Sequence, residues 1–167
     1  MNDHVCRNDT PPPARPYIPI VSPRATGRPV EGIILSPALE GYWTHWLDQR
    51  TKPCYVLENP VTGHALATCY YCQQAAPRRW KGYLGIELAH EGRIALLELT
   101  RAAVESCPRL TLAQAVLRGL RITAWRSGRR ANGRCLCRLD ECLSANTADL
   151  PPAPDIEQSL LRIWTGP

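Results

Sequence analysis

The chain has 167 residues, a hydrophobic fraction of 44% and a formal net charge of +5. This length is enough for one domain with a real core, and this composition excludes a chain that is disordered throughout. The first residues lack the apolar run of a signal peptide, and no stretch is long and apolar enough to span a bilayer. We therefore expect a cytoplasmic protein, whose eight cysteines are metal ligands or core residues more often than disulfides.

The placement of proline divides the chain into three predicted parts. Residues 1–37 hold eight of the sixteen prolines, which is typical of an extended, flexible arm. Residues 145–167 begin with a second linker, ANTADLPPAP, and end in a short tail. We expect residues 38–144 to form one globular domain between the arm and this linker.

Apolar stretches between turn signals predict two hairpins in the first half of that domain. CYVLE and HALAT flank a turn that contains Pro60 and Gly63. YLGIELA and RIALLEL flank His90, Glu91 and Gly92, where the glycine can adopt a positive φ.

Helix signals follow, and then two more strands. Thr100 is placed to cap a helix over RAAVESC, which should end near Pro108. Thr111 begins TLAQ, a capping-box pattern, so we expect a second helix that stops at Gly119. LRITAWR and RCLCRLD are predicted strands joined by the loop SGRRANG.

The order of these elements favours one fold class. Three strands, a helix and two strands follow one another, as in the OB-fold, a five-stranded Greek-key barrel. We therefore expect a mainly β protein with an OB-like barrel, whose first strand carries the cysteine hairpin. Other small barrels and α+β folds use the same elements. The predicted core includes Leu84, Ile86, Leu88, Leu97, Leu120 and Ile122.

Three cysteines of the first hairpin predict a metal site. Cys69 and Cys72 have the spacing of a zinc knuckle, in which both thiolates reach one ion from a tight turn. The midpoint between Cys54 and Cys69 falls inside the predicted turn, so folding the hairpin brings Cys54 opposite Cys69. The alternative is that these are ordinary core cysteines.

The fourth ligand is one of two histidines. His64 lies at the turn end of the hairpin, five residues from Cys69. That separation is roughly 16 Å along a strand, too far to share a tetrahedral site. His45 lies on the incoming chain and can fold back, so we favour a closed structural Zn²⁺ site of His45, Cys54, Cys69 and Cys72.

The remaining cysteines allow a second site, which we consider the weaker interpretation. Cys135 and Cys137 face the same way as Leu139, as small core residues do, and they alternate with Arg134, Leu136 and Arg138. The residues in question are Cys107, Cys135, Cys137 and Cys142.

Cationic and aromatic residues cluster twice in the domain. One cluster follows the zinc knuckle, and the other covers the last two strands, where Trp125 shares a face with Arg121. Arginine binds phosphates and flat rings stack on unpaired bases, so these clusters favour single-stranded nucleic acid. The alternative is that the tryptophans are core residues and the arginines merely solvate a surface. The predicted contacts are Arg78, Arg79, Trp80, Lys81, Tyr83, Arg121, Trp125, Arg129, Arg130, Arg134 and Arg138.

These motifs carry a resemblance over about residues 42–142. An OB-fold with a zinc site written His, Cys, Cys-x-x-Cys is similar to the zinc-containing OB-fold single-stranded DNA-binding proteins of the T-even phage type. The ligand order and the terminal Cys-x-x-Cys agree, whereas the intervening spacings differ. The resemblance implies cooperative, sequence-tolerant binding of single strands and leaves DNA or RNA open.

The tail has an apolar helical stripe of Ile156, Leu160, Ile163 and Trp164. It can recruit a protein partner or dock on its own domain, and the sequence does not separate these two outcomes.

Three functions therefore compete. The first is a non-enzymatic protein that binds single-stranded nucleic acid, most simply DNA. The second is a zinc-bearing adaptor that acts through the tail and the proline-rich arm. The third is a nuclease or deaminase, but no His-x-Glu precedes Cys69 and four protein ligands leave no position for a reacting water.

Overall fold

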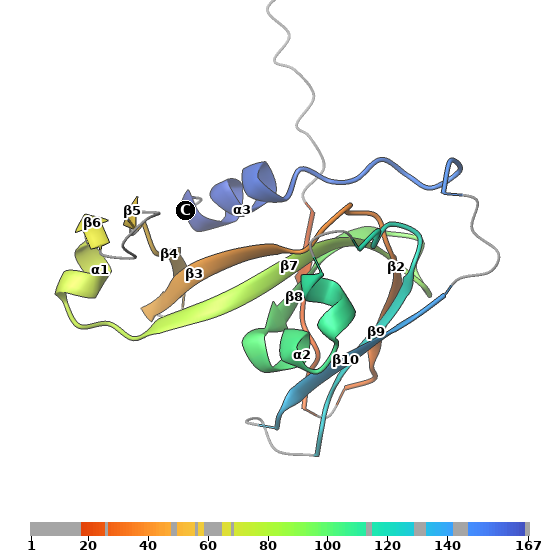
Figure 1. The fold of residues 1–167 in the computed structure, drawn as a ribbon, viewed down its shortest axis with the longest axis horizontal. Helices are drawn as coiled ribbons and strands as arrows, with labels where there is room; N and C mark the ends of the chain where they lie inside the picture. The colour runs from red at the N-terminus through yellow and green to blue at the C-terminus, as the bar shows by residue number, and fades with distance from the viewer. Residues whose placement is uncertain are drawn as a thin grey trace, which may run out of the picture.

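One mixed sheet dominates the computed structural model (Figure 1). Neighbouring strands in this sheet follow the order β1-β8-β7-β2-β9-β10, and β3 and β4 extend it beside β7. The β1–β8 pair is parallel, and the other pairs are antiparallel. The structure describes residues 18–25, 27–47, 50–55, 57–58, 65–67, 69–112, 115–128, 133–141 and 147–165. The strands are β1 (Ile20–Val21), β2 (Val30–Ile34), β3 (Glu40–Leu47), β4 (Arg50–Pro53), β7 (Arg78–Leu88), β8 (Ile94–Thr100), β9 (Arg121–Arg126) and β10 (Cys135–Asp140), with β5 (Leu57–Glu58) and β6 (Ala65–Ala67) in a separate two-stranded sheet.

The mainly β class is confirmed, whereas the closed barrel is not shown. The described residues hold three α-helices, α1 (Tyr70–Gln73), α2 (Arg101–Glu105) and α3 (Ile156–Thr165). No ladder joins β8 to β10 among the described strands, so the sheet is open. Instead, β1 lies along the second edge of β8 and pairs there with Leu96 and Leu97.

The sheet reaches into the segment that composition assigns to a flexible arm. β2 lies in the middle of the sheet, between β7 and β9. Ile34 is fully buried, and Ile33 pairs with both Glu87 and Arg121. The described part of residues 1–37 therefore belongs to the domain, because the short apolar run VEGII fills a central strand position despite the prolines around it.

The predicted β7–β8 hairpin and the helix that follows it are confirmed. Glu87 pairs with Ile94 across the turn, where Gly92 has a φ of +58°. The Thr100 hydroxyl accepts a hydrogen bond from the Ala103 N–H (3.3 Å) and caps α2. The second predicted helix is wrong for the residues that can be described, because Thr111 ends a 3-10 turn that begins at Pro108.

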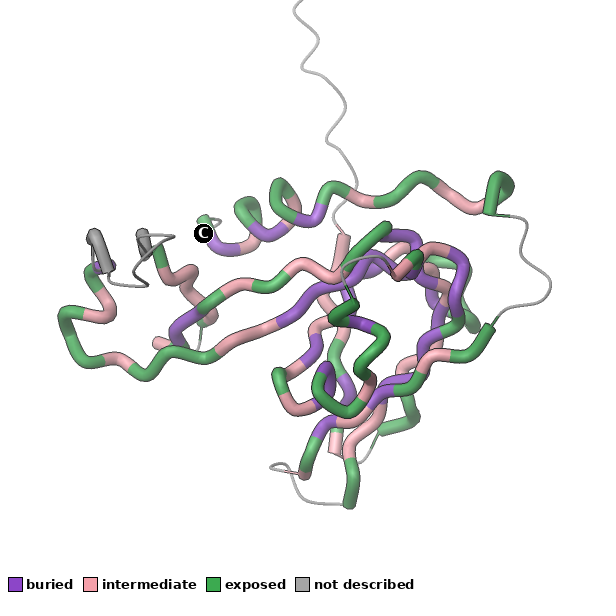
Figure 2. Tube along the Cα trace, viewed as in Figure 1, coloured by how far each residue is buried: buried purple, intermediate pink, exposed green. Residues whose placement is uncertain are grey.

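A single apolar cluster fills the inner side of the curved sheet (Figure 2). All six predicted core residues belong to it, and each is at most 9% exposed. Cys135 and Cys137 join the same cluster from β10, as the simpler interpretation of these cysteines expects.

The C-terminal helix docks on its own domain. Ile156, Leu160 and Trp164 pack with Tyr83 and Leu96 on the outer side of the sheet. Ile163 packs against the same cluster. Of the two outcomes that the sequence left open, the structure shows docking on the chain's own domain, because the apolar stripe predicted as a partner-binding surface is buried there.

The linker before α3 is also fixed to the domain. The Arg118 guanidinium donates hydrogen bonds to the backbone carbonyls of Leu35 (2.7 Å), Leu150 (3.0 Å) and Pro151 (2.8 Å). Pro154 covers Gly85 so closely that no side chain would fit there. This anchoring holds α3 against the sheet and positions one wall of the cavity described below.

Candidate functional site

A ribbon extends the sheet beyond the apolar core and carries the candidate site (Figure 1). We use "the ribbon" for β3, β4 and residues 78–82 of β7. Trp43 pairs with Trp80 and His45 with Arg78 across β3 and β7. Gly41 and Gly82 leave room for the Trp80 ring, which lies over both of them. On this face the ribbon is therefore covered by a single ring and has little apolar core of its own.

Four side chains meet at the free end of the ribbon. His45 comes from β3, Cys54 follows β4, and Cys69 and Cys72 flank the start of α1. Their ligand atoms all lie within 4.8 Å of one another. This is the set predicted from the sequence, and it is able to hold a metal ion. His64, the other candidate, lies outside the described residues.

Four of the six distances between the ligand atoms lie between 3.3 and 3.8 Å. Cys54 Sγ lies 3.8 Å from Cys69 Sγ and 3.6 Å from Cys72 Sγ. His45 Nε2 lies 3.3 Å from Cys69 Sγ and 3.5 Å from Cys72 Sγ. Two of the four ligands are buried, since His45 is 1% exposed and Cys69 9%. Cys54 and Cys72 are half-buried.

Backbone contacts fix the orientation of each ligand. His45 Nδ1 lies 3.1 Å from the Ala76 carbonyl. Because a carbonyl only accepts, Nδ1 carries a proton, and Nε2 is the ring nitrogen that faces the thiols. The Cys72 N–H donates to Cys69 Sγ (3.4 Å), and the Cys54 N–H donates to the Trp43 carbonyl (2.8 Å).

The thiols influence one another's ionisation. Burial acts to raise the pKa of Cys69, but hydrogen bonds with Cys72, Cys54 and His45 lower it to about 6. Burial raises the pKa of Cys54 to about 12, and hydrogen bonds with the other two thiols add to that rise. Neighbouring thiolates repel one another, and a bound cation would offset that repulsion.

The other cysteines do not extend this cluster. The Cys137 thiol donates a hydrogen bond to the Ala103 carbonyl (3.2 Å) inside the core. Among the described residues, His45, Cys54, Cys69 and Cys72 form the single group suited to a metal. Cys142 lies outside the described residues.

The predicted nucleic-acid residues fall into two separate groups. Arg78 and Arg79 are exposed and Trp80 is half-buried on the ribbon. β9 joins the sheet through β2, which pairs with β7 at Ile86–Leu88. Arg78 is eight residues from that point, or about 26 Å along an extended strand. The two groups therefore do not form one continuous face.

Two predicted contacts on β7, Lys81 and Tyr83, have structural roles. Tyr83 is fully buried beneath α3, so its placement at the surface was wrong. Tyr83 was predicted to bind nucleic acid because it follows the cationic and aromatic residues 78–81, but α3 covers it. Lys81 donates hydrogen bonds to Glu98 (2.8 Å) and Thr51 (3.2 Å) and joins β4, β7 and β8.

The second group lies on β9 and β10. Arg121, Arg134 and Arg138 are exposed, and Arg138 pairs with Asp140 (3.2 Å). Trp125 is half-buried beside Leu136. Arg129 and Arg130 lie outside the described residues.

Sequence reasoning missed a set of exposed rings around the metal ligands. We call Trp43, Trp46, Tyr55 and Tyr70 the aromatic collar. Trp46, Tyr55 and Tyr70 are each next in sequence to a ligand, and the Trp43 carbonyl accepts the Cys54 N–H. They are 38%, 52%, 62% and 67% exposed, and no other described aromatic side chain is among the exposed large hydrophobic residues. For two of these rings the sequence signal was the run YWTHW, in which Trp43 and Trp46 lie within two residues of the ligand His45.

A cation accompanies the collar. The Arg78 guanidinium lies 4.5 Å from the centre of the Trp43 ring. Arg50 and Arg79 are also exposed on the ribbon, and Lys52 is half-buried. Such a surface offers both flat rings and positive charge.

Comparison with known proteins assigns no family. No protein-family model matches the chain, no curated protein matches it, and no solved structure matches it. No helix in the described ranges is long and apolar enough to cross a membrane.

Proposed function

We propose that this chain is a non-enzymatic protein that binds single-stranded nucleic acid on a zinc-braced ribbon. The observation that carries the proposal is the aromatic collar, with Arg78 against Trp43, around a closed set of four metal ligands. Exposed rings stack on unpaired bases, and arginines contact phosphates. Single-stranded DNA is the first substrate class to test, and RNA is the second.

The ligand geometry supports zinc as the metal. Ligands placed tetrahedrally at about 2.3 Å for sulfur and about 2.0–2.1 Å for nitrogen have S···S distances of about 3.8 Å and S···N distances of about 3.6 Å. The four distances given above, 3.8, 3.6, 3.3 and 3.5 Å, lie close to these values. Four protein ligands complete a tetrahedron, which favours a structural role over hydrolysis.

The strand order supports an OB-like architecture. Counting β2 with β3 as the first strand, the order β8-β7-β2-β9-β10 reads 3-2-1-4-5, with α2 between the third and fourth strands. An OB-fold has this order and adds a pair between its third and fifth strands. The proposed fold is thus an OB-like sheet without that closing pair.

The adaptor alternative is less well supported. This alternative relies on the tail and the proline-rich arm, and the apolar stripe of the tail is buried on the chain's own domain. An adaptor would therefore need the collar as its docking surface, where it would compete with nucleic acid.

The test is a fluorescence anisotropy titration of labelled dT, U and duplex oligonucleotides at several salt concentrations. We expect both single strands to bind more tightly than duplex DNA. Trp43→Ala should weaken single-strand binding about 5- to 100-fold, because base stacking on a ring is worth about 1–3 kcal/mol. The matched control is Val116→Ala, which changes an exposed apolar side chain outside the ribbon. Unchanged binding in Trp43→Ala and Trp46→Ala would reject the collar as the binding surface.

The metal is tested separately by elemental analysis of the purified chain. We expect one zinc per chain, and we expect His45→Ala to loosen it more than His64→Ala. Full metal retention in His45→Ala would show that another residue supplies the fourth ligand.

A further inference from the structure

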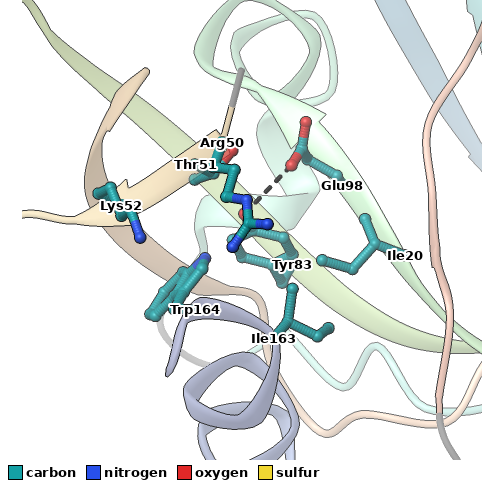
Figure 3. A pocket seen from close by; sticks show the side chains of 8 residues that line it. All are labelled: Ile20, Arg50, Thr51, Lys52, Tyr83, Glu98, Ile163 and Trp164. Carbon is teal, nitrogen blue, oxygen red and sulfur yellow. Dashed lines mark hydrogen bonds between the residues drawn. The ribbon is translucent and has the colours of Figure 1, made fainter. Parts of the chain in front are cut away.

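A cavity of about 310 Å³ lies where β1, β4, β7, β8 and α3 meet (Figure 3). It is separate from the metal ligands, none of which lines it. Its volume is at the lower end of the range for small-molecule sites. The cavity exists because α3 docks across the sheet and leaves a gap beside β4.

The walls of this cavity are partly apolar. Ile20 of β1 and Ile163 of α3 form one side, and the Trp164 ring forms another. Trp164 is held in place by edge-to-face contacts with Tyr42 (5.6 Å between ring centres) and Tyr83 (6.5 Å). A flat or apolar ligand body would therefore meet a preformed surface.

The acidic group in the cavity is already engaged. Glu98 accepts hydrogen bonds from Lys81 (2.8 Å) and from the Tyr83 hydroxyl (3.1 Å). These partners balance its negative charge. Glu98 therefore does not neutralise the two further cations of the lining, Arg50 and Lys52.

The lining of the cavity brings together three groups that can donate hydrogen bonds: the Trp164 indole N–H, the Arg50 guanidinium and the Lys52 ammonium. Trp164 is 8% exposed, and its Nε1–H is buried. This N–H has no hydrogen-bond partner among the described residues. A buried donor of this kind is rare in native proteins, because an unmade hydrogen bond there is costly. Figure 3 shows its nitrogen on the side of the ring that faces the charged ends of Arg50 and Lys52. Neither cation forms an ion pair with a described acid.

We infer that this cavity binds a small organic phosphate with a flat body, of the nucleoside monophosphate class. A phosphate offers three terminal oxygens, which match the guanidinium, the ammonium and the indole N–H. The flat body would lie against the Trp164 ring and the isoleucines. The binding of single strands on the ribbon is a separate proposal, and this inference does not depend on it.

The test is isothermal titration calorimetry of the full-length, metal-loaded chain with adenosine monophosphate. Adenosine and inorganic phosphate serve as partial probes. We expect saturable one-to-one binding of adenosine monophosphate, with each partial probe at least about tenfold weaker because it lacks one half of the contacts. An absence of saturable binding would overturn the inference, as would inorganic phosphate binding equally tightly.

Two variants locate the site. Trp164→Phe keeps a ring and removes the N–H, and Arg50→Gln removes one cation. Each should weaken binding of adenosine monophosphate about tenfold, because each removes a hydrogen bond to a charged oxygen. The matched control is Arg93→Gln, which changes an exposed arginine of the β7–β8 turn. Unchanged affinity in Arg50→Gln, a substitution at an exposed position that folding should tolerate, would overturn the assignment even if Trp164→Phe did not fold.

A ribbon variant separates this site from strand binding. Trp43→Ala should weaken binding to dT and leave the affinity for adenosine monophosphate unchanged. Loss of adenosine monophosphate binding in Trp43→Ala would place the nucleotide on the collar and overturn the cavity site.

Discussion

Removal of the metal should open the end of the ribbon and leave the rest of the sheet intact. The ligands join β3 and β4 to α1, and the bridge from Cys54 to Cys69 closes a loop of 15 residues. A cross-link over a loop of that length is worth about 3 kcal/mol of chain entropy. The apolar core lies around β2, β8 and β9 and contains none of the four ligands. The loss should therefore be local.

Amide hydrogen exchange measures this loss residue by residue. Two amides report on the metal end, namely Cys54 N–H, bonded to the Trp43 carbonyl (2.8 Å), and Ala75 N–H, bonded to the Cys72 carbonyl (3.0 Å). After chelation their exchange should accelerate about 100-fold, which corresponds to about 3 kcal/mol. The reference is Leu35 N–H, bonded to the Gly85 carbonyl (2.8 Å), and its exchange should change little.

Two outcomes would refute this reasoning. Unchanged exchange at Cys54 after confirmed metal loss would show that the ribbon end holds its shape without the metal. Equal acceleration at Leu35 would show that the metal supports the whole domain. The matched control is Cys107→Ser, which changes a half-buried cysteine outside the cluster and should leave the exchange at Cys54 unchanged.

Three further predictions concern the scaffold. Leu160→Ala should lower the free energy of unfolding by about 2–4 kcal/mol in urea titrations, because Leu160 is fully buried on the face of α3 that packs against Tyr83 and Leu96. Leu161→Ala, at a 39% exposed position of the same helix, should cost less than about 1 kcal/mol. Equal costs would mean that α3 is not docked as described. Ala75→Gly should raise the melting temperature, because Ala75 has a φ of +56° after α1. This conformation costs a residue with a Cβ about 1 kcal/mol, and glycine avoids that cost. A lower melting temperature would contradict this reasoning. Cys137 should resist iodoacetamide at pH 8 in the native protein, because burial raises its pKa to about 12 and keeps the thiol protonated. Rapid alkylation of Cys137, measured by mass spectrometry, would show that the core opens.

Local chemistry made the metal cluster predictable from sequence. The spacing of Cys69 and Cys72 and the turn between Cys54 and Cys69 specify short-range geometry, which depends little on the rest of the fold. The choice of His45 over His64 followed from strand length alone. Thr100 and Gly92 were predictable for the same reason, since a cap and a tight turn are decided by adjacent residues.

Long-range packing accounts for most of what the sequence did not predict. The stripe on α3 shows that the helix needs an apolar cover, but it does not say whether that cover is Tyr83 or another protein. The placement of Tyr83 at the surface failed for the same reason. The strand VEGII was not predicted, because the prolines of residues 1–37 led us to assign that whole segment to a flexible arm. TLAQ has the letters of a capping box, yet Thr111 donates its hydroxyl to the Pro108 carbonyl (2.9 Å) and closes a 3-10 turn.

The ribbon explains why this chain would use a metal at all. Near α3, one face of the ribbon is covered by Tyr42, Tyr83 and Trp164, and the other carries Trp80 over two glycines. Beyond that point β3 is covered only in part by the described elements: His45 is buried and contacts Tyr71 of α1 (5.6 Å between ring centres), whereas the large side chains Trp43 and Trp46 are exposed. A two- or three-stranded extension without a core of its own is marginally stable in water. A metal held by His45, Cys54, Cys69 and Cys72 would supply the missing stabilisation and would leave the neighbouring rings exposed.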